Sequence, residues 1–403
     1  MEIIRELCSF EGRLAGTDAE RRAANRLAGR LRENGRRAEV EPTYIHPQYA
    51  LVHAVHCLLG FAGSLAAIEV PALGFGLVLA AATSMYLDLN YRLYVVRSLF
   101  FRRASQNVVS AGRNPRAPAT LVVCAHLDAG RGGAVFAPSR AKRYAQLSKR
   151  YPWLGPLRVL FWSLAALLPL LGARMAGVES GALSVLQLFP TLVLLIGIFA
   201  LTEIHLSDVI PGANDNASGV ATAISLTGEL DAEPPDNLDV WIVLDGGDET
   251  LQEGMRAFVR SRRKQLDRSL TFFLAIDSVG RGDVRYETAA GWVVSYAMDR
   301  RLTELAAAIA ESDAGAGADK RFRAEPLRRG TAGESMPPRI AGYRAIGITC
   351  RDRNGYTPDS HLPTDRPEAI DTNSLDRAHE FALELVRRLD RDLGRRGDGA
   401  EAR

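Results

Sequence analysis

Five side chains that could bind metal stand in five separate segments of this 403-residue sequence. The most distinctive segment runs from Pro211 to Gly219, where Asp215 lies between two asparagines and glycines flank the acid. Glycine lets the backbone turn tightly, and an apolar helical pattern begins directly after this run. A carboxylate at the start of a helix is available to a metal ion or a substrate. We interpret Asp215 as the bridging ligand of a centre with two metal ions.

Four further candidate ligands follow segments that are expected to form strands. Open α/β sheets carry functional side chains at the carboxyl ends of their strands, so these residues should converge with Asp215 on one sheet edge. Two imidazoles and three carboxylates suit a pair of zinc-type cations that share one carboxylate. Such a pair can clamp and polarise a scissile carbonyl group. The candidates are His126 after residues 120–125, Glu249 after 238–244, Asp277 after 270–276, and His361 in the loop after 344–350.

Other interpretations of single residues stay open at this point. A histidine at the end of a strand is often an ordinary structural residue, and Asp128 could serve to orient the His126 imidazole. No serine or cysteine nucleophile motif competes with a metal site, because the sequence has no GxSxG run. Cys124 lies inside a strand that should be buried.

The segments between the candidates determine how they are positioned. The expected strands are largely continuous apolar runs, and helical patterns lie between them. Residues 3–34 are amphipathic with a break at 12–18, where Thr17 or Asp18 could cap the second helix. Residues 374–393 form a long amphipathic pattern at the other end of the chain. Together these features predict an α/β fold with a central mixed sheet flanked by helices.

Four apolar segments interrupt this pattern. Residues 50–68 and 70–87 contain no Asp, Glu, Lys or Arg, and each has about the length needed to cross a bilayer. Residues 181–202 form a third such segment. Residues 159–173 form a segment of only about 15 residues. It could span a bilayer only if the side chains of the flanking arginines extend toward the headgroups. We expect two hairpins, or about four transmembrane helices. The alternative is a set of buried core helices or a hydrophobic dimer surface.

The charged residues predict how the chain is organised around a membrane. Nearly all arginines fall on one side of the expected spans, which the positive-inside rule places in the cytoplasm. Asp215 follows residue 202 by about a dozen residues, so an extended chain keeps it within about 40–45 Å of that span. The expected parts are 1–48 (start of the main domain), 49–90 (first hairpin), 91–156 (main domain), 157–206 (second hairpin), 207–393 (main domain) and 394–403 (disordered tail).

Composition excludes several other classes of protein. The chain has 50 Lys and Arg against 47 Asp and Glu, and without a long basic run we expect no nucleic-acid partner. The four cysteines are scattered without CxxC spacing, which argues against a zinc ribbon and a disulfide framework. Reduced cysteines in a cytoplasmic setting are the simpler interpretation. Residues 1–37 are charged throughout and lack the apolar core of a signal peptide.

The motifs together resemble those of the M28 family of zinc metallopeptidases. They are Asn107-Val108-Val109, His126-Leu127-Asp128, the run 212–219, Asp248-Glu249 with Gly254 and Arg256-Ala257-Phe258, Asp277-Ser278, and His361-Leu362-Pro363-Thr364-Asp365. The resemblance implies an α/β peptidase fold, two zinc ions, and a peptide substrate that is usually cut from its free N-terminus. The implied ligands are His126 and Asp277 for one ion, Glu249 and His361 for the other, and Asp215 between them.

One position departs from the family pattern. The family carries Glu-Glu where this chain has Asp248-Glu249, and the first of the pair is the general base. Aspartate is one methylene shorter, so its oxygen could lie roughly 1 Å too far away, which can cost about 100-fold in rate. We expect Asp248 to act as the base of a membrane-anchored aminopeptidase. The alternatives are a slow enzyme or one with an unusual substrate, a non-hydrolytic M28-like binding or receptor module, and a glutaminyl-cyclase-like acyltransferase.

Overall fold

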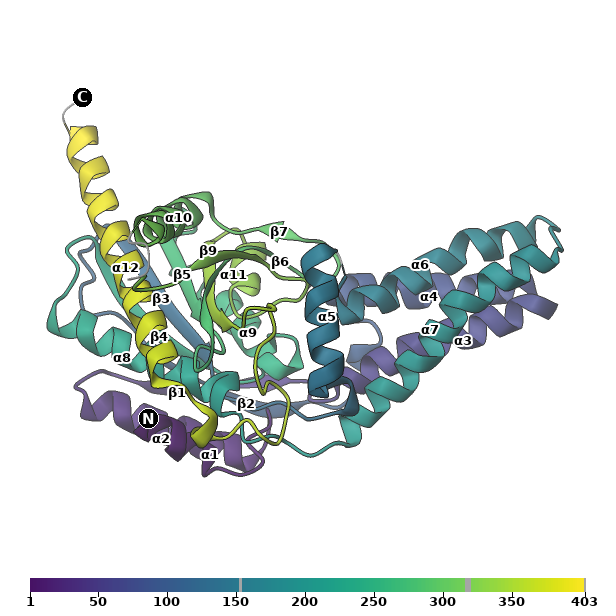
Figure 1. Cartoon of the computed structure of the whole chain (residues 1–403), viewed down its shortest axis with the longest axis horizontal. Coiled ribbons are helices and arrows are strands. Elements are labelled where there is room, and N and C mark those ends of the chain that lie inside the picture. The colour runs from purple at the N-terminus through teal and green to yellow at the C-terminus, as the bar shows by residue number, and fades with distance from the viewer. Residues whose placement is uncertain (152–153, 316–319, 402–403) are drawn as a thin grey trace.

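The structure is a computed structural model that describes residues 1–151, 154–315 and 320–401. Its strands are β1 (Glu39–Ile45), β2 (Arg103–Ser110), β3 (Ala119–His126), β4 (Leu238–Asp245), β5 (Thr271–Ile276), β6 (Asp283–Ala290), β7 (Tyr296–Ala297), β8 (Glu325–Arg328) and β9 (Arg344–Arg351). They form one sheet in the order β1-β2-β4-β3-β5-β9-β6-β7, and β8 pairs with β6 (Figure 1).

The inner strands of this sheet are parallel. β3 pairs with β4 on one side and with β5 on the other, and β5 pairs with β9. β2 and β6 run antiparallel to β4 and β9, so the sheet is mixed, as the sequence predicts. Because the four predicted strands are parallel, the residues that follow them lie at a common edge of the sheet.

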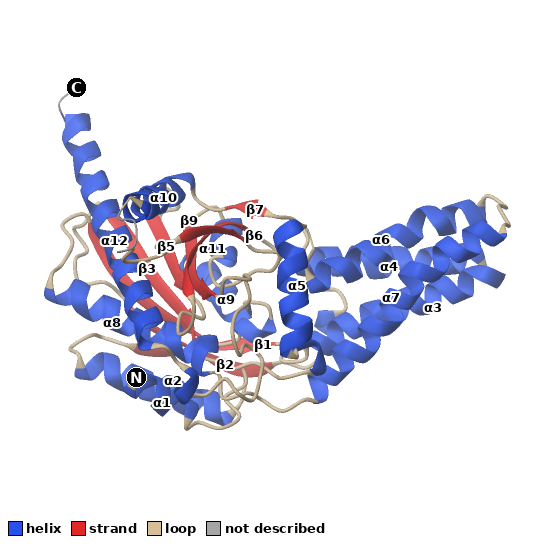
Figure 2. Ribbon diagram, viewed as in Figure 1, coloured by secondary structure: helices blue, strands red, loops and turns tan. Residues whose placement is uncertain are grey.

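Helices cover both faces of the sheet (Figure 2). The helices of the main domain are α1 (Glu2–Cys8), α2 (Asp18–Glu33), α5 (Pro138–Arg150), α8 (Gly219–Ala232), α9 (Glu253–Arg262), α10 (Arg300–Ala314), α11 (Met336–Ile340) and α12 (Thr372–Glu401). One apolar core joins α1, α2, α8, α10 and α12 to the strands and includes Leu27, Leu226 and Phe381. On the other face, Met255 and Phe258 of α9 fill a second core. The predicted α/β class is confirmed.

Four helices project from one end of the domain as a separate bundle (Figure 1). They are α3 (Tyr49–Glu69), α4 (Pro71–Leu89), α6 (Pro156–Met175) and α7 (Gly181–Leu206), and each is long and apolar enough to cross a membrane. α6 is 20 residues long because it extends the apolar segment 159–173 at both ends. In the first hairpin Gly63 and Gly74 allow close packing, since a Cβ on Gly74 would lie 2.4 Å from the Gly63 carbonyl oxygen.

The outward surface of the bundle is apolar. Phe189, Ile196 and Phe199 on α7 are 66–68% exposed, whereas Leu164 and Leu194 inside the bundle are fully buried. A helix that faced water would carry polar residues on its outer side. Exposed apolar side chains of this density are typical of helices surrounded by lipid, and they disfavour the alternative of buried core helices.

The bundle and the main domain meet at one apolar cluster, which also lies beside the carboxyl edge of the sheet. Leu251, in the segment after β4, is buried among the side chains of the bundle helices. Tyr49, Phe136 and Trp292 pack against the same cluster. The bundle therefore contacts the part of the domain that carries the candidate ligands.

Parts of the chain differ from the sequence-based prediction, and two of these differences have a clear physical reason. Residues 394–401 belong to α12, so this stretch of the predicted disordered tail 394–403 is helical; 402 and 403 lie outside the described residues. Extending a helix costs less than starting one, because each added residue gains a hydrogen bond. The second difference is β6, which was not predicted because buried Arg285 and Glu287 hide its apolar pattern.

Candidate metal centre

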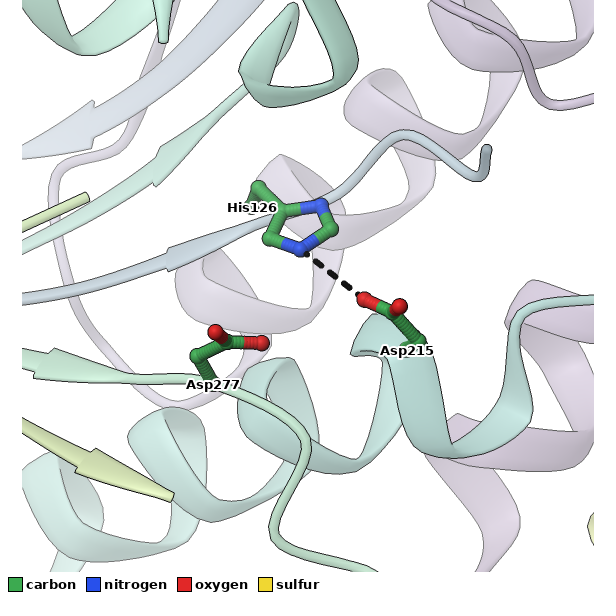
Figure 3. A group of neighbouring side chains, drawn as sticks. All are labelled: His126, Asp215 and Asp277. Atoms are coloured by element: carbon green, nitrogen blue, oxygen red, sulfur yellow. Dashed lines mark ion pairs between the residues drawn. The ribbon is translucent and has the colours of Figure 1, made fainter. Parts of the chain in front are cut away.

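The five candidate ligands lie together at the carboxyl edge of the sheet. They form two groups that share Asp215. One group is His126, Asp215 and Asp277 (Figure 3), and the other is Asp215, Glu249 and His361. Within each group, one ligand atom from each residue lies within 4.8 Å of the others. The structure thus brings together every residue that the sequence nominates as a ligand.

The two carboxylate oxygens of Asp215 face different groups. Oδ1 lies 3.5 Å from His126 Nε2, and Oδ2 lies 3.9 Å from His361 Nε2. His361 Nε2 in turn lies 4.0 Å from Glu249 Oε2. Ligand atoms on one tetrahedral zinc ion are roughly 3.3–3.7 Å apart, so both groups are close to the required size. The donor set of two imidazoles and three carboxylates fits a pair of zinc ions.

The loop that carries Asp215 is held in place by glycine geometry and by Asp365. Gly212 has a φ of 67°, and a Cβ there would lie 2.7 Å from the Asp215 carbonyl oxygen. The Asp365 carboxylate accepts hydrogen bonds from the backbone N–H groups of Asn214 (2.6 Å) and Asp215 (3.0 Å). These bonds fix the backbone of the ligand itself, so its side chain projects into the site.

The two asparagines beside Asp215 connect its loop to the strand end that carries Asp277. Asn216 Oδ1 accepts a hydrogen bond from the Ser278 N–H at 2.9 Å. Asn214 Oδ1 accepts one from the Gly280 N–H at 2.8 Å. The amides flanking the acid are therefore structural links, and they set the spacing between Asp215 and Asp277.

Asp128 links the first histidine to the turn that follows β4. His126 Nδ1 lies 3.1 Å from the Asp128 carbonyl oxygen, so its N–H donates there and Nε2 is left for a metal. The Asp128 carboxylate accepts hydrogen bonds from the backbone N–H groups of Asp248 (3.2 Å) and Glu249 (3.1 Å). The orienting role that the sequence suggests for Asp128 thus extends to the candidate base and to a second ligand.

The loop of residues 129–137 forms one wall of the second group. His361 Nδ1 donates to the Arg131 carbonyl oxygen at 2.8 Å, which again leaves Nε2 for a metal. The ring of Phe136 stacks on the His361 ring with a centroid distance of 4.3 Å. A Cβ on Gly130 would lie 2.6 Å from Glu249 Oε1 and 2.7 Å from His361 Cε1, so any larger residue there would displace these two candidate ligands. The wall is therefore in direct contact with two candidate ligands.

The candidate base Asp248 lies on a strained turn, η4 (Asp248–Thr250). Leu251 and Gln252 after it have left-handed backbone conformations, with φ of 64° and 59°, which are unfavourable for residues other than glycine. The side chain of Leu251 is held in the apolar cluster of the bundle, and Gln252 Oε1 accepts a hydrogen bond from Tyr91 Oη at 2.6 Å. Contacts with the bundle and the segment after α4 therefore maintain this conformation.

Arg97 fixes the same turn from the side of the helical bundle. Its fully buried guanidinium pairs with Asp88 of α4 at 2.9 Å, and its Nη1 donates to the Thr250 carbonyl oxygen at 2.9 Å. The same Nη1 lies 3.5 Å from the carboxylate of Glu253, the first residue of α9. One cation therefore joins the first hairpin to both ends of the segment that follows the candidate base.

Three carboxyl groups lie at the base position, and two of them, those of Asp245 and Glu334, belong to buried residues. Within the described residues, Asp248 Oδ1 and both carboxylate oxygens of Asp245 are buried without a hydrogen-bond partner. Glu334 Oε1 accepts a hydrogen bond from the backbone N–H of His126 at 2.9 Å. Burial and the charge of Glu334 raise the pKa of Asp248 well above its ordinary value, and burial raises the pKa of Asp245 to about 7. A carboxyl group with a raised pKa is suited to exchange protons near neutral pH.

Glu334 is a residue of the site that the sequence does not reveal. It lies in the loop between the short strand β8 and α11, outside any recognised motif, and it reaches His126 across 208 residues of chain. Arg329, on the same side of the site, places its Nη1 2.6 Å from Asp277 Oδ2 and 3.2 Å from Glu287 Oε1. This ion pair holds the Asp277 carboxylate in position.

Comparison with known proteins finds a family match for part of the chain and similar folds among solved structures. The model of the family described as Peptidase family M28 matches residues 202–386. No curated protein matches the chain. Similar solved structures include a leucine aminopeptidase precursor from Bacteroides thetaiotaomicron, with a TM-score of 0.52 and 14% identity over 95% of this chain and 94% of the other. A Zn-dependent exopeptidase from Parabacteroides distasonis has a TM-score of 0.53 and 11% identity over 96% and 95%.

A glutaminyl cyclase from Bacteroides thetaiotaomicron is similar to the same extent, with a TM-score of 0.52 and 14% identity over 95% of this chain and 94% of the other. Likeness at these identities concerns the fold alone, whereas the family match concerns the sequence. Four of the five candidate ligands lie inside the matched range, and His126 joins them through β3 of the same sheet. Residues 202–386 therefore form a peptidase family M28 domain, completed by the strands on its N-terminal side and joined there to two helical hairpins.

Proposed function

We propose that this protein is a membrane-anchored di-zinc metallopeptidase that acts as an aminopeptidase. The observation that carries the proposal is the division of the two Asp215 oxygens between His126 and His361. A carboxylate placed in this way would hold two cations between the histidines, and the family match suggests the class of reaction. When bound, the zinc pair acts as a Lewis acid that polarises the scissile carbonyl group.

The residues of this chain supply the proton transfer. Asp248 accepts a proton from the attacking water and passes it to the leaving amine. Its raised pKa and its unpartnered Oδ1 support this role. The Asp128 carboxylate positions the backbone N–H of Asp248, and Arg97 positions the carbonyl group of Thr250 at the end of the same turn. The shorter side chain of Asp248 makes this positioning more important than it is for a glutamate.

The enclosure of the site supports action on a chain end. The His126 side chain is 2% exposed and that of His361, the most open of the five, is 19% exposed. The interior of an extended peptide would have to displace the wall of residues 129–137, whereas a terminus can enter alone. Carboxylates outnumber cations around the ligands, which suits the ammonium group of a free N-terminus.

The bundle gives the enzyme its location. We propose that α3, α4, α6 and α7 cross the membrane and that the main domain lies in the cytoplasm, as the arginine distribution predicts. A cysteine at exposed position 304 (Glu304→Cys) should react with an impermeant maleimide in inverted vesicles and not in intact cells. Recovery of the chain without detergent would refute a spanning bundle.

The test of the enzymatic proposal uses the full chain purified in detergent. It should contain two zinc ions per chain, measured by inductively coupled plasma mass spectrometry, and it should hydrolyse aminoacyl-p-nitroanilides. N-acetylated versions of the same substrates should not react. Absence of tightly bound zinc after purification with added metal would refute the proposal, whatever the chosen substrate.

A second candidate activity follows from the similar glutaminyl cyclase. A peptide substrate that begins with glutamine distinguishes cyclase activity from peptidase activity. A cyclase releases ammonia and leaves the peptide at full length, whereas an aminopeptidase shortens the peptide by one residue. A protein that binds zinc but does neither would be a non-hydrolytic binding module.

A further inference from the structure

Helix α5 carries a positive charge that the proposed peptidase chemistry does not use. The sequence between Asp128 and Glu179 contains no acidic residue. Among the residues that the structure describes, the five cations of α5 are exposed and none pairs with a carboxylate. Three of them donate hydrogen bonds to uncharged oxygens, the Ala134 and Arg353 carbonyls and the Tyr151 hydroxyl, which do not cancel their charge. The five are Arg140, Lys142, Arg143, Lys149 and Arg150.

Both ends of α5 are tied to the end of the bundle that faces the domain. Before α5, the Ala134 N–H donates at 3.0 Å to the carboxylate of Glu203, near the end of α7. After α5, the chain enters α6 at Pro156, within about 20 Å of Arg150 even if fully extended. α5 accordingly lies at the base of the bundle, with its axis across the bundle axis (Figure 1).

The exposed side of α5 combines cations with an apolar residue. Ala145 is buried, and Arg143, Leu147 and Arg150 recur at helical spacing on the opposite side. Leu147 is 50% exposed. A helix with this composition, lying in the plane of a membrane surface, is typical of interfacial anchors that select anionic lipids.

We propose that α5 is an interfacial helix that binds the anionic headgroups of the membrane in which the bundle is embedded. The inference rests on the proposed membrane location of the bundle, but not on the zinc chemistry. α5 continues directly from the loop of residues 129–137, whose Phe136 stacks on His361. Binding of α5 to headgroups therefore also restrains the wall of the metal site.

The experiment places the full chain in lipid nanodiscs of phosphatidylcholine alone or of phosphatidylcholine mixed equally with phosphatidylglycerol. An environment-sensitive fluorophore is attached through Gln146→Cys in a Cys8→Ser background. Its emission should shift to the blue only in the phosphatidylglycerol discs, and salt should reverse the shift. Hydrogen exchange of residues 129–137 should be slower in the same discs.

A variant with all five α5 cations changed to glutamine should lose the shift and bind phosphatidylglycerol at least about tenfold more weakly. The control changes three exposed cations, Arg260 near the end of α9 and Arg263 and Lys264 directly after it, to glutamine and should behave like the unaltered chain. Equal emission in the two kinds of disc, or an equal effect of both variants, would overturn the inference. Failure of the unaltered chain to insert into either kind of disc would instead overturn the proposed membrane location of the bundle.

Discussion

Arg97 Nη1 donates a hydrogen bond of 2.9 Å to the carbonyl oxygen of Thr250, two residues after the candidate general base. The same guanidinium forms a buried ion pair with Asp88 at the end of the second apolar helix. The conformation of the turn is therefore determined partly by a contact with α4 of the bundle. Since Leu251 and Gln252 hold left-handed conformations next to it, the turn would relax if this contact were lost.

Arg97→Lys should reduce kcat by about 10–100-fold with little change in KM, because one ammonium group cannot replace three contacts of a planar guanidinium. The measurement is steady-state hydrolysis of an aminoacyl-p-nitroanilide. The control is Arg36→Lys, which breaks a buried two-bond pair with Asp231 far from the ligands. That variant should lose stability but keep kcat. Equal losses of kcat in the two variants would show that Arg97 only stabilises the fold.

Asp248→Asn should reduce kcat by about 10²–10⁴-fold while the zinc content stays unchanged. The amide cannot accept the proton, whereas the ligands and their positions are kept. In the unaltered protein the rate should fall as the pH drops through the raised pKa of Asp248, because a protonated carboxyl is no base. Asp248→Glu should keep or raise the rate. A rate that is insensitive to both substitutions would remove Asp248 from the mechanism.

Substitution of the ligands should change the metal stoichiometry in a pattern that only a shared carboxylate explains. Asp215→Ala should lose both zinc ions, because Asp215 belongs to both groups. His361→Ala should lose one ion and keep the other. Chelation of the unaltered protein should abolish activity and lower Tm, since the metal binds the folded state. Retention of one zinc ion by Asp215→Ala would contradict the bridging role.

Glu20 should make stability depend on pH. Its carboxylate accepts a hydrogen bond from the Gly16 N–H at 2.6 Å, and burial raises its pKa from 4.5 to about 8. Between these values the folded state keeps a proton that the unfolded state has released, so stability falls as pH rises. Glu20→Gln should remove this slope and be more stable at pH above 8 by on the order of 2–4 kcal/mol. Thermal unfolding of both proteins in detergent, at the low and the high end of this pH range, measures the difference in stability.

The parts of the fold that the sequence predicts are those whose signal is local. β3, β4, β5 and β9 are continuous apolar runs, and the four bundle helices are marked by length and lack of charge. The convergence of the ligands follows from one rule, because parallel strands end at one edge. His126 and His361 can be grouped with Asp215 from the sequence alone, since each stands at or after such an end.

The other contacts of the site could not be predicted, because they depend on residues far apart in the chain. Nothing near Glu334 marks it as a neighbour of His126, and its loop has no regular pattern. Arg97 resembles any other arginine beside a span, and only the folded chain brings it to Thr250. Charged residues inside strands, such as Arg285 in β6, hide the alternation that would identify the strand.

The position of the hairpins has a consequence for biosynthesis. The central strand β3 is made between the two hairpins, while both of its neighbours, β4 and β5, follow the second hairpin. The ribosome therefore delivers the middle of the sheet before the strands that hold it in place. For that interval β3 has two unpaired edges, which are prone to aggregation. With the bundle in a membrane, as we propose, the nascent strand would be held beside that membrane, which would keep copies apart until α7 is complete.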